Sequence, residues 1–324
     1  MPIAASGGAS APQPLIRWQN NMVVVLTALA PAAAAAFYFW GARALAVLAV
    51  TNAVAFATEY AFLRTYREPV TSAVFVTGSL LALSLPPRVP LWMCAVGAVV
   101  GVAVGKMFFG GMGRNVFNPA LVGRAFLYVC FPTAMTAGWA VPYGGPVGGL
   151  AHWAPTDAVS AATPLPLLAQ GAGPSWTALL LGNVPGSLGE TCKVALLLGG
   201  AYLLWRKVAS WEIIASTVGS YLVLTGAFRL AGWGQGADPL HGVLAGGFLY
   251  GALFMATDPV SANRTRPGRW AYGVLIGLAT VLIRDLGNFP EGIMFAILLG
   301  NTFGPIAEEG LTRWSARGRG EAAR

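Results

Sequence analysis

Five short segments of the 324-residue chain place polar, charged or helix-breaking residues beside long apolar stretches. They are 110–120, 157–164, 186–193, 254–262 and 284–292. Lipid does not tolerate such groups unless protein or a cofactor satisfies them. The carboxylates, hydroxyls and arginines in and beside these segments could hold an anionic or redox-active group, so we look for chemistry there.

Arg124 is the most unusual candidate. Asn118 and Pro119 have the residue types of a helix N-cap and a first helical position. A helix that begins there places Arg124 about one and a half turns inside an apolar segment. An arginine at that depth either snorkels to the surface or binds a phosphate, a carboxylate or backbone carbonyls. The sequence leaves both interpretations open.

The segment 157–164 reads Asp-Ala-Val-Ser-Ala-Ala-Thr-Pro. Its carboxylate and two hydroxyls are typical of a capped turn when the segment is taken alone. A carboxylate and two hydroxyl groups would also suit the attachment of a polar group.

Three other charged positions have equally plain interpretations. Glu190 opens a short apolar segment, where an acidic residue complements the helix dipole. Asp258 precedes Pro259, which is typical of a helix stop. Arg284 and Asp285 fit interfacial charges at a helix end. Zinc or haem ligation is not predicted, because the available side chains have no metal-like spacing: Cys94, Cys130, Cys192, His152 and His241.

The composition shows what must position these residues. Charged side chains make up 10% of the chain and hydrophobic ones 56%, whereas soluble domains have about 25% charged residues. With a mean hydropathy of +0.63, this excludes a soluble enzyme, a disordered chain and a nucleic-acid-binding protein. The net charge of +8 is typical of the loops of a membrane protein.

Apolar segments long enough for membrane spans recur along the chain. A bilayer core of about 30 Å needs about 20 helical residues, and on that measure we predict ten spans: 22–40, 42–63, 72–86, 91–109, 117–137, 191–205, 211–229, 240–256, 270–286 and 291–307. The third and sixth are short and contain Gly, Ser or Thr, which is typical of helices broken inside protein. The predicted fold class is an all-α polytopic membrane protein.

These spans divide the chain into a cytoplasmic tail, a five-helix half, an outer-face loop, a second five-helix half and a basic cytoplasmic tail, at 1–21, 22–137, 138–189, 190–309 and 310–324. The 5+5 arrangement allows a pseudo-repeat, although the internal sequence echoes are weak. With both termini in the cytoplasm, most of the 20 Lys and Arg residues fall on that side, as the positive-inside rule requires.

Four motifs follow one another in order: Asn118-Pro119-Ala120, Gly189-Glu190-Thr191, Ala256-Thr257-Asp258-Pro259-Val260 and Pro290-Glu291-Gly292. Together with the spans, they resemble a membrane flavoprotein family. That family contains the D subunit of the Rnf electron-transport complex and the B subunit of the sodium-pumping NADH:quinone oxidoreductase. The resemblance runs from about residue 70 to about residue 306, and it implies a protein of the bacterial cytoplasmic (inner) membrane.

In that family the outer loop carries Asp-x-x-Ser-Gly-Ala-Thr, whose last threonine is joined to FMN through a phosphoester bond. The positions that match, with the proline that follows, are Asp157, Ser160, Ala162, Thr163 and Pro164. Ala161 stands where glycine is usual. The resemblance thus implies that a flavin transferase attaches FMN to Thr163 on the outer face. It adds Arg124, Asn118 and Glu190 as further candidates for flavin binding.

The ending Thr163-Pro164-Leu165 is closer to the Rnf form, and the short N-terminal region also favours the Rnf D subunit. The resemblance then implies other membrane and peripheral subunits as partners, electron transfer between ferredoxin and NAD, and Na⁺ or H⁺ transport. A second, noncovalent riboflavin is known in relatives. We do not expect the chain to be a complete enzyme alone, because it has no nicotinamide site and no iron–sulfur cysteines.

Three alternatives remain. The first is a B-type component of the sodium-pumping quinone reductase. The second is a flavin-free secondary transporter, in which Glu59, Asp258 and Glu291 would serve as ion ligands or proton relays. The third is a scaffold of helices that holds partner subunits. Membrane lipid is expected as a partner in every case.

Overall fold

The computed structural model describes residues 14–137, 139–143, 148–150, 153, 173–233, 238–287 and 292–322, with the backbone alone at 137 and 314–322. These residues are predominantly helical, with one pair of two-residue parallel strands. The predicted helical fold class is confirmed.

The first half of the chain contains β1 (Ile16–Arg17), α1 (Asn20–Trp40), α2 (Ala42–Tyr66), β2 (Val70–Thr71), α3 (Ala73–Ser84), α4 (Leu91–Ala103), the 3₁₀ turn η1 (Met107–Phe109), α5 (Pro119–Cys130) and α6 (Pro132–Ala137). Helix α2 packs against α3 and α4, and α4 packs against α5. The strand β1 lies parallel to β2, with Ile16 opposite Val70, so the start of the described chain is fixed to the α2–α3 connection.

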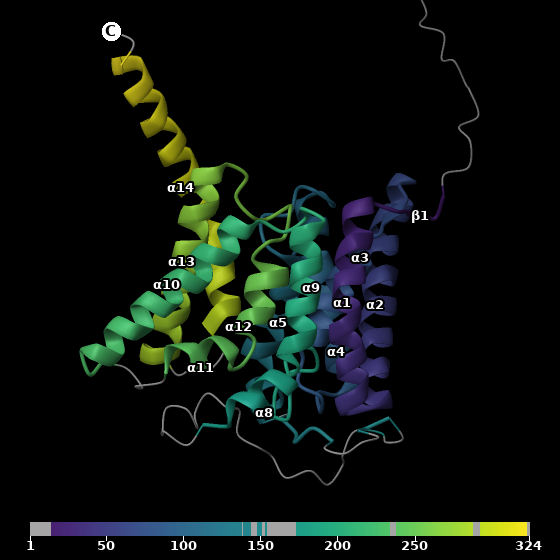
Figure 1. The fold of residues 1–324 in the computed structure, drawn as a ribbon. Helices are drawn as coiled ribbons and strands as arrows, with labels where there is room; N and C mark the ends of the chain where they lie inside the picture. Colours follow the sequence, from purple (N-terminus) through teal and green to yellow (C-terminus); the bar gives the residue numbers. More distant parts are fainter. Residues whose placement is uncertain are drawn as a thin grey trace, which may run out of the picture.

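The second half contains α8 (Trp176–Leu181), α9 (Lys193–Trp205), α10 (Trp211–Leu230), α11 (Pro239–Leu244), α12 (Phe248–Tyr250), the π-helical turn η2 (Gly251–Met255), α13 (Arg266–Leu286) and α14 (Gly292–Ala322). Helix α13 packs against both α10 and α14, while α9 packs against α1 of the first half. Figure 1 shows α5, α9 and α12 in the middle of the molecule, between α1–α4 on one side and α10, α13 and α14 on the other.

Small residues let α10 and α13 approach closely. A β-carbon at Gly273 would lie 1.9 Å from Ser216 Oγ, and one at Gly277 would lie 2.0 Å from Ser220 Oγ. Such contacts between small residues are typical of helices that pack inside membranes.

Each of the ten predicted spans overlaps a helix or a series of short helices. By length and apolar composition, four helices of the described residues are candidates to cross a membrane: Asn20–Trp40, Ala42–Tyr66, Leu91–Phe109 and Trp211–Leu230. The total of ten spans stays a prediction. Helices α3 and α9 have 12 and 13 residues, too few to cross a core of about 30 Å, as expected for broken helices.

The predicted span 240–256 is not one continuous helix. Helix α11 ends at Leu244, and the chain resumes in α12 at Phe248 after a turn through Ala245 and two glycines. Gly246 has φ 61°, a left-handed conformation that glycine adopts readily. The break explains why the apolar run does not form a single helix.

The described chain has two distinct ends. Figure 1 shows β1 and the C-terminal part of α14 at one end, and α8 and α11 at the opposite end. We call them the β1 end and the α8 end. Their orientation in the membrane and the predicted domain limits stay predictions.

Candidate functional site

Two helix breaks meet near the centre of the molecule. The chain before α9 folds back onto the C-terminal end of α3, where Leu188 N–H donates to Leu85 O at 3.0 Å and Gly189 N–H donates to Leu83 O at 2.7 Å. The turn between α11 and α12 lies beside them, because Gly246 O contacts the first residue of α9. We call residues 83–85, 187–191 and 245–247, with Lys193, the helix-break junction.

Gly189 permits this meeting. A β-carbon at Gly189 would lie 2.6 Å from Leu83 Cβ, closer than carbon atoms approach in folded proteins. The glycine of the Gly-Glu-Thr motif therefore lets the backbone of one break reach the end of another helix.

Glu190 and Arg124 are both buried, and each side chain is 2% exposed. Protein covers Arg124 inside α5, so the structure supports a binding role over snorkelling.

The carboxylate of Glu190 is only half satisfied. Its Oε1 accepts a hydrogen bond from Ser187 N–H at 2.9 Å, and this contact closes the turn before α9. Its Oε2 is buried and has no hydrogen-bond partner. Glu190 was predicted to cap the helix that follows, but the N-cap of α9 is Cys192. Glu190 instead closes the turn before α9 through Oε1 and keeps Oε2 available.

Lys193 completes the junction. It is the first residue of α9 and is 1% exposed. Its Nζ donates to Glu190 O and, at 2.9 Å, to Gly246 O. The main-chain carbonyls of both breaks thus bind the same ammonium group.

Arg284 is not an interfacial charge, contrary to the sequence-based interpretation. It is buried, and its guanidinium donates to Gly242 O at 2.8 Å, Ala245 O at 3.2 Å and Tyr221 OH at 3.0 Å. The last carbonyls of a helix lack intrahelical partners. Arg284 binds the carbonyls of Gly242 and Ala245 at the C-terminal end of α11. Lys193 binds the carbonyl of the following residue, Gly246.

Asn118 lies at the start of α5, and its N-cap role is confirmed. Its Oδ1 accepts from Ala120 N–H at 3.0 Å, and Pro119 follows as the first helical residue. Its backbone N–H donates to Asn301 Oδ1, and its Nδ2 donates to Met255 O. The residue joins α5 to α14 and η2, and its predicted role toward a flavin stays a prediction.

Asp258 also forms a capped turn, as predicted for a helix stop. Its Oδ2 accepts from Ser261 Oγ at 2.7 Å. Asp258, Asn115, Asn118 and Lys106 line a cavity of about 30 Å³, which has room for about one water molecule. A flavin at this place would require the surrounding elements to move apart.

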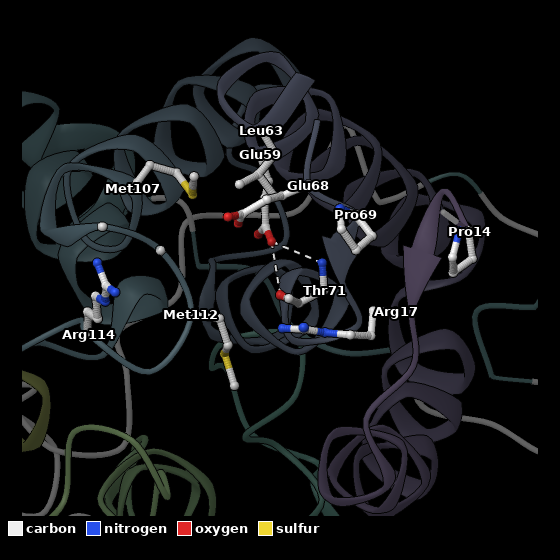
Figure 2. A pocket seen from close by; sticks show the side chains of 12 residues that line it. Pro14, Arg17, Glu59, Leu63, Glu68, Pro69, Thr71, Met107, Met112 and Arg114 are labelled. Carbon is white, nitrogen blue, oxygen red and sulfur yellow. Dashed lines mark hydrogen bonds between the residues drawn. The ribbon is translucent and has the colours of Figure 1, made fainter. Parts of the chain in front are cut away.

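A larger cavity of about 550 Å³ opens at the β1 end, as Figure 2 shows. Its lining residues are Pro14, Arg17, Glu59, Leu63, Glu68, Pro69, Thr71, Met107, Gly110, Gly111, Met112 and Arg114. Glu59 is bound on both oxygens: Oε2 pairs with Lys106 Nζ at 2.5 Å, and Oε1 accepts from Thr71 N and Oγ1 at 3.1 and 2.9 Å. A carboxylate that already has an internal cation is a poor ligand for a transported ion, which weakens the transporter alternative.

Sequence reasoning missed the two buried lysines. Lys106 and Lys193 are among the Lys and Arg residues that the positive-inside rule assigns to the two membrane faces, whereas both are 1% exposed. Lys193 begins the apolar helix α9, and Lys106 follows the apolar helix α4 by three residues. Those positions are the signal that could have identified them.

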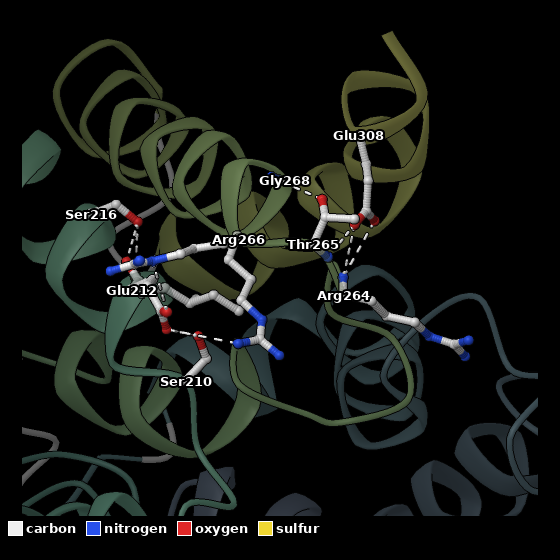
Figure 3. A network of polar contacts seen from close by, with 10 residues as sticks. Ser210, Glu212, Ser216, Arg264, Thr265, Arg266, Gly268 and Glu308 are labelled. Carbon is white, nitrogen blue, oxygen red and sulfur yellow. Dashed lines mark hydrogen bonds and ion pairs between the residues drawn. The ribbon is translucent and has the colours of Figure 1, made fainter. Parts of the chain in front are cut away.

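Charged residues at the β1 end form a separate network, drawn in Figure 3. Arg266 and Arg269 lie 3.7 and 3.8 Å from the carboxylate of Glu212. Glu308 accepts from the N–H groups of Arg264 and Thr265. Partial burial favours a higher pKa for Glu308, but these hydrogen bonds outweigh it and lower the pKa. The network fixes the start of α13 to α10 and α14.

The residues of the predicted flavin motif, Asp157, Ser160, Ala162, Thr163 and Pro164, lie outside the described residues, as does Glu291. The described parts that flank the motif lie at the α8 end. Before it, Gly149 N–H donates to Tyr38 O near the end of α1, and the Trp153 ring lies 5.6 Å from the guanidinium of Arg43. After it, the ring of Trp176 in α8 contacts that of His241 in α11, with centroids 3.7 Å apart.

Asp238 fixes α11 at the same end. Its carboxylate accepts from His241 N–H at 3.1 Å, contacts His241 Nδ1 at 3.0 Å and pairs with Arg229 at 2.8 Å. Partial burial favours a higher pKa, but the bonds from His241 and Arg229 outweigh it and hold the pKa of Asp238 below its usual value.

Comparison with known proteins gives consistent matches. Residues 13–313 match the model of the "NQR2, RnfD, RnfE family". The B subunit of the Na(+)-translocating NADH-quinone reductase of Azotobacter vinelandii is 42% identical over 278 residues, which cover 82% of this chain and 66% of that protein. The proteins of the same name from Pseudomonas aeruginosa and Klebsiella pneumoniae are each 40% identical, over 77% and 76% of this chain and 62% and 61% of their own lengths. The matched part thus spans somewhat less than two thirds of these relatives.

Proposed function

The chain belongs to the NQR2, RnfD, RnfE family of membrane electron-transport subunits, and from this membership we propose that it carries FMN on Thr163 and relays electrons within an ion-translocating complex. The B subunits that it resembles are parts of a multi-subunit enzyme, so the partners are the other subunits of such a complex.

The described residues that flank the motif support this proposal. They are fixed to α1 and α11 at the α8 end, opposite the β1 end. With the termini in the cytoplasm, as the positive-inside rule favours, Thr163 faces the outer side, where a flavin transferase acts. The described residues on either side of the motif, Trp153 and Trp176, contact Arg43 and His241 at this end.

Bound FMN supplies the redox chemistry, and the protein supplies its position and electrostatic environment. A phosphoester at Thr163 prevents loss of the flavin. Arg124 places a buried positive charge in the helix bundle, which favours a nearby anionic group. Glu190 and Lys193 hold the helix-break junction together through hydrogen bonds to its backbone.

The named relatives favour a complex of the sodium-translocating quinone-reductase type over the Rnf type. The Thr-Pro-Leu ending after the motif is the feature that points to Rnf. Purification of the complex through a tag on this chain would separate the two types. An NADH-oxidising flavoprotein among its partners supports the first type, and a ferredoxin-linked iron–sulfur protein supports the second.

Covalent attachment is tested by producing the chain together with its flavin transferase. We expect a band that fluoresces on a denaturing gel, and a peptide from 157–170 whose mass includes FMN. Thr163→Ala abolishes both signals. Thr156→Ala, one residue before the motif, is the matched control and keeps them.

An unlabelled wild-type band, with the transferase shown to be active on another substrate, would contradict the proposal and favour the transporter alternative. Normal assembly and electron transfer in Thr163→Ala would favour the scaffold alternative.

A further inference from the structure

Lys193 occupies a place that disfavours a cation unless other groups compensate. It begins α9, where the helix dipole is positive, and it is 1% exposed. A buried ammonium group is costly unless hydrogen bonds replace its water. The compensation here comes from main-chain oxygens of the junction.

Those oxygens belong to two separate breaks. Glu190 O lies in the turn before α9, and Gly246 O lies in the turn after α11. Unwound backbone carbonyls and the C-terminal ends of broken helices are the groups that coordinate Na⁺ in many transporters. The ammonium of Lys193 thus sits where two such carbonyls converge.

Three more oxygens of the same turn are buried without a hydrogen-bond partner: Ser187 Oγ, Glu190 Oε2 and Thr191 Oγ1. The carboxylate oxygen is the most costly, because an unsatisfied buried charge loses its hydration. It lies against the second break, since a β-carbon at Gly247 would be 2.7 Å away from it. Carboxylate, hydroxyl and carbonyl oxygens are the ligands that hard cations prefer.

We propose that the helix-break junction is a binding position for a monovalent cation and that the Lys193 ammonium is its tethered occupant. While the ammonium stays in place, a free cation such as Na⁺ is excluded. The Glu190 carboxylate supplies the negative charge that makes the position selective for cations. When the lysine charge is removed, that negative charge and the freed carbonyls remain, and a free cation takes its place.

This inference goes beyond the proposed electron relay and does not depend on flavin at Thr163. Its test measures cation binding, so a failure of either proposal leaves the other intact.

The experiment uses the full-length chain, purified in detergent as wild type and as Lys193→Met, which keeps the length of the side chain and removes its charge. Binding of radioactive ²²Na⁺ and the unfolding temperature are measured as NaCl replaces choline chloride at constant ionic strength. We expect Lys193→Met to gain about one saturable Na⁺ per chain over wild type, and to show an unfolding temperature that rises with Na⁺.

Two controls place the effect at the junction. Lys207→Met removes an exposed lysine and should behave as wild type. Glu190→Gln combined with Lys193→Met should fold but lose the added Na⁺ binding, because the negative charge is gone.

Folded Lys193→Met with no more saturable Na⁺ than wild type would overturn the proposal. So would retention of the added binding in the double variant. If Lys193→Met unfolds in choline and folds in Na⁺, the cation has replaced the ammonium, as proposed. If it unfolds in both salts and the double variant does too, Lys193 has only a structural role and the proposal is wrong.

Discussion

Lys106 and Lys193 are equally buried, at 1% exposure, but different groups hold them. Lys106 contacts a carboxylate and a hydroxyl, with Glu59 Oε2 at 2.5 Å and Thr71 Oγ1 at 3.0 Å. Lys193 contacts main-chain carbonyls of two helix breaks. Within the described part of the chain, the first arrangement joins the α4–η1 connection to α2 and β2, and the second joins the irregular ends of short helices.

The carboxylates differ as well. Both oxygens of Glu59 accept hydrogen bonds, whereas Oε2 of Glu190 accepts none. A saturated ion pair gains nothing from another ligand and acts as a clamp between segments. A half-satisfied carboxylate beside carbonyl oxygens has capacity for a cation. The comparison therefore separates a structural region at the β1 end from a region at the junction that can exchange its occupant.

Lys106→Met should cause the largest loss of stability. It leaves Glu59 buried without its ion-pair partner, and loss of one member of a buried pair costs about 3–5 kcal/mol. We expect a large fall in the unfolding temperature, which is measured by tryptophan fluorescence of the protein in detergent. The double variant Glu59→Gln, Lys106→Met removes both charges and should recover much of the loss.

Na⁺ should rescue Lys106→Met less than Lys193→Met. The Lys106 ammonium contacts Glu59 Oε2 and Thr71 Oγ1, whereas the Lys193 ammonium contacts two main-chain carbonyls, which are groups that coordinate Na⁺ in many transporters. Rescue by Na⁺ to the same extent as in Lys193→Met would show that the two regions do not differ in the way described.

Gly189→Ala should disturb the helix-break junction without changing any charge. The added carbon would lie 2.6 Å from Leu83 Cβ, and overpacking of this kind costs about 1–3 kcal/mol. We expect a lower unfolding temperature and faster hydrogen exchange at 187–191, measured by mass spectrometry, with the Glu59–Lys106 region unaffected.

Gly219→Ala is the matched control. A β-carbon at Gly219 in α10 would meet no atom within 4 Å, so the same substitution should be neutral or slightly stabilising there. Equal effects of the two substitutions would mean that close contact at Gly189 does not hold the breaks together.

Much of the fold was predictable from the sequence because the signals are local. Asn118 followed by Pro119 marks the start of α5, and the short apolar segments at 72–86 and 191–205 contain the short helices α3 and α9. Arg124 was expected inside a helix and is buried there. Each inference depends on neighbouring residues alone.

The junction was not predictable for the opposite reason. Lys193 is held by Gly246 O, 53 residues away, and Arg284 by carbonyls about 40 residues away. A backbone carbonyl has no side-chain signature, so no pattern in the sequence marks it as a partner. Gly246 and Gly247 are two of the four glycines in the apolar run 240–256, which is typical of a continuous helix. The break at these two residues is evident only once the chain is folded.

Asp238→Asn tests the smallest charge effect, at the exposed α8 end, and extends the comparison from buried to exposed charges. Asparagine caps a helix about as well as aspartate, so the variant keeps the cap of α11 and loses the ion pair with Arg229. The pKa of Asp238 is lowered in the folded protein. Its charge therefore stabilises the fold above the unfolded-state pKa, near 3.8, and this contribution disappears as the pH falls through the lower, folded-state pKa.

The carboxylate of Asp238 is 38% exposed, so solvent and salt limit the effect to less than about 1 kcal/mol. We expect wild type to exceed the variant slightly in unfolding temperature at pH 7 and low salt, with the difference shrinking in acid and in 0.5 M choline chloride. A difference that stays constant from pH 7 to pH 3 would assign the effect to the shape of the cap and not to its charge.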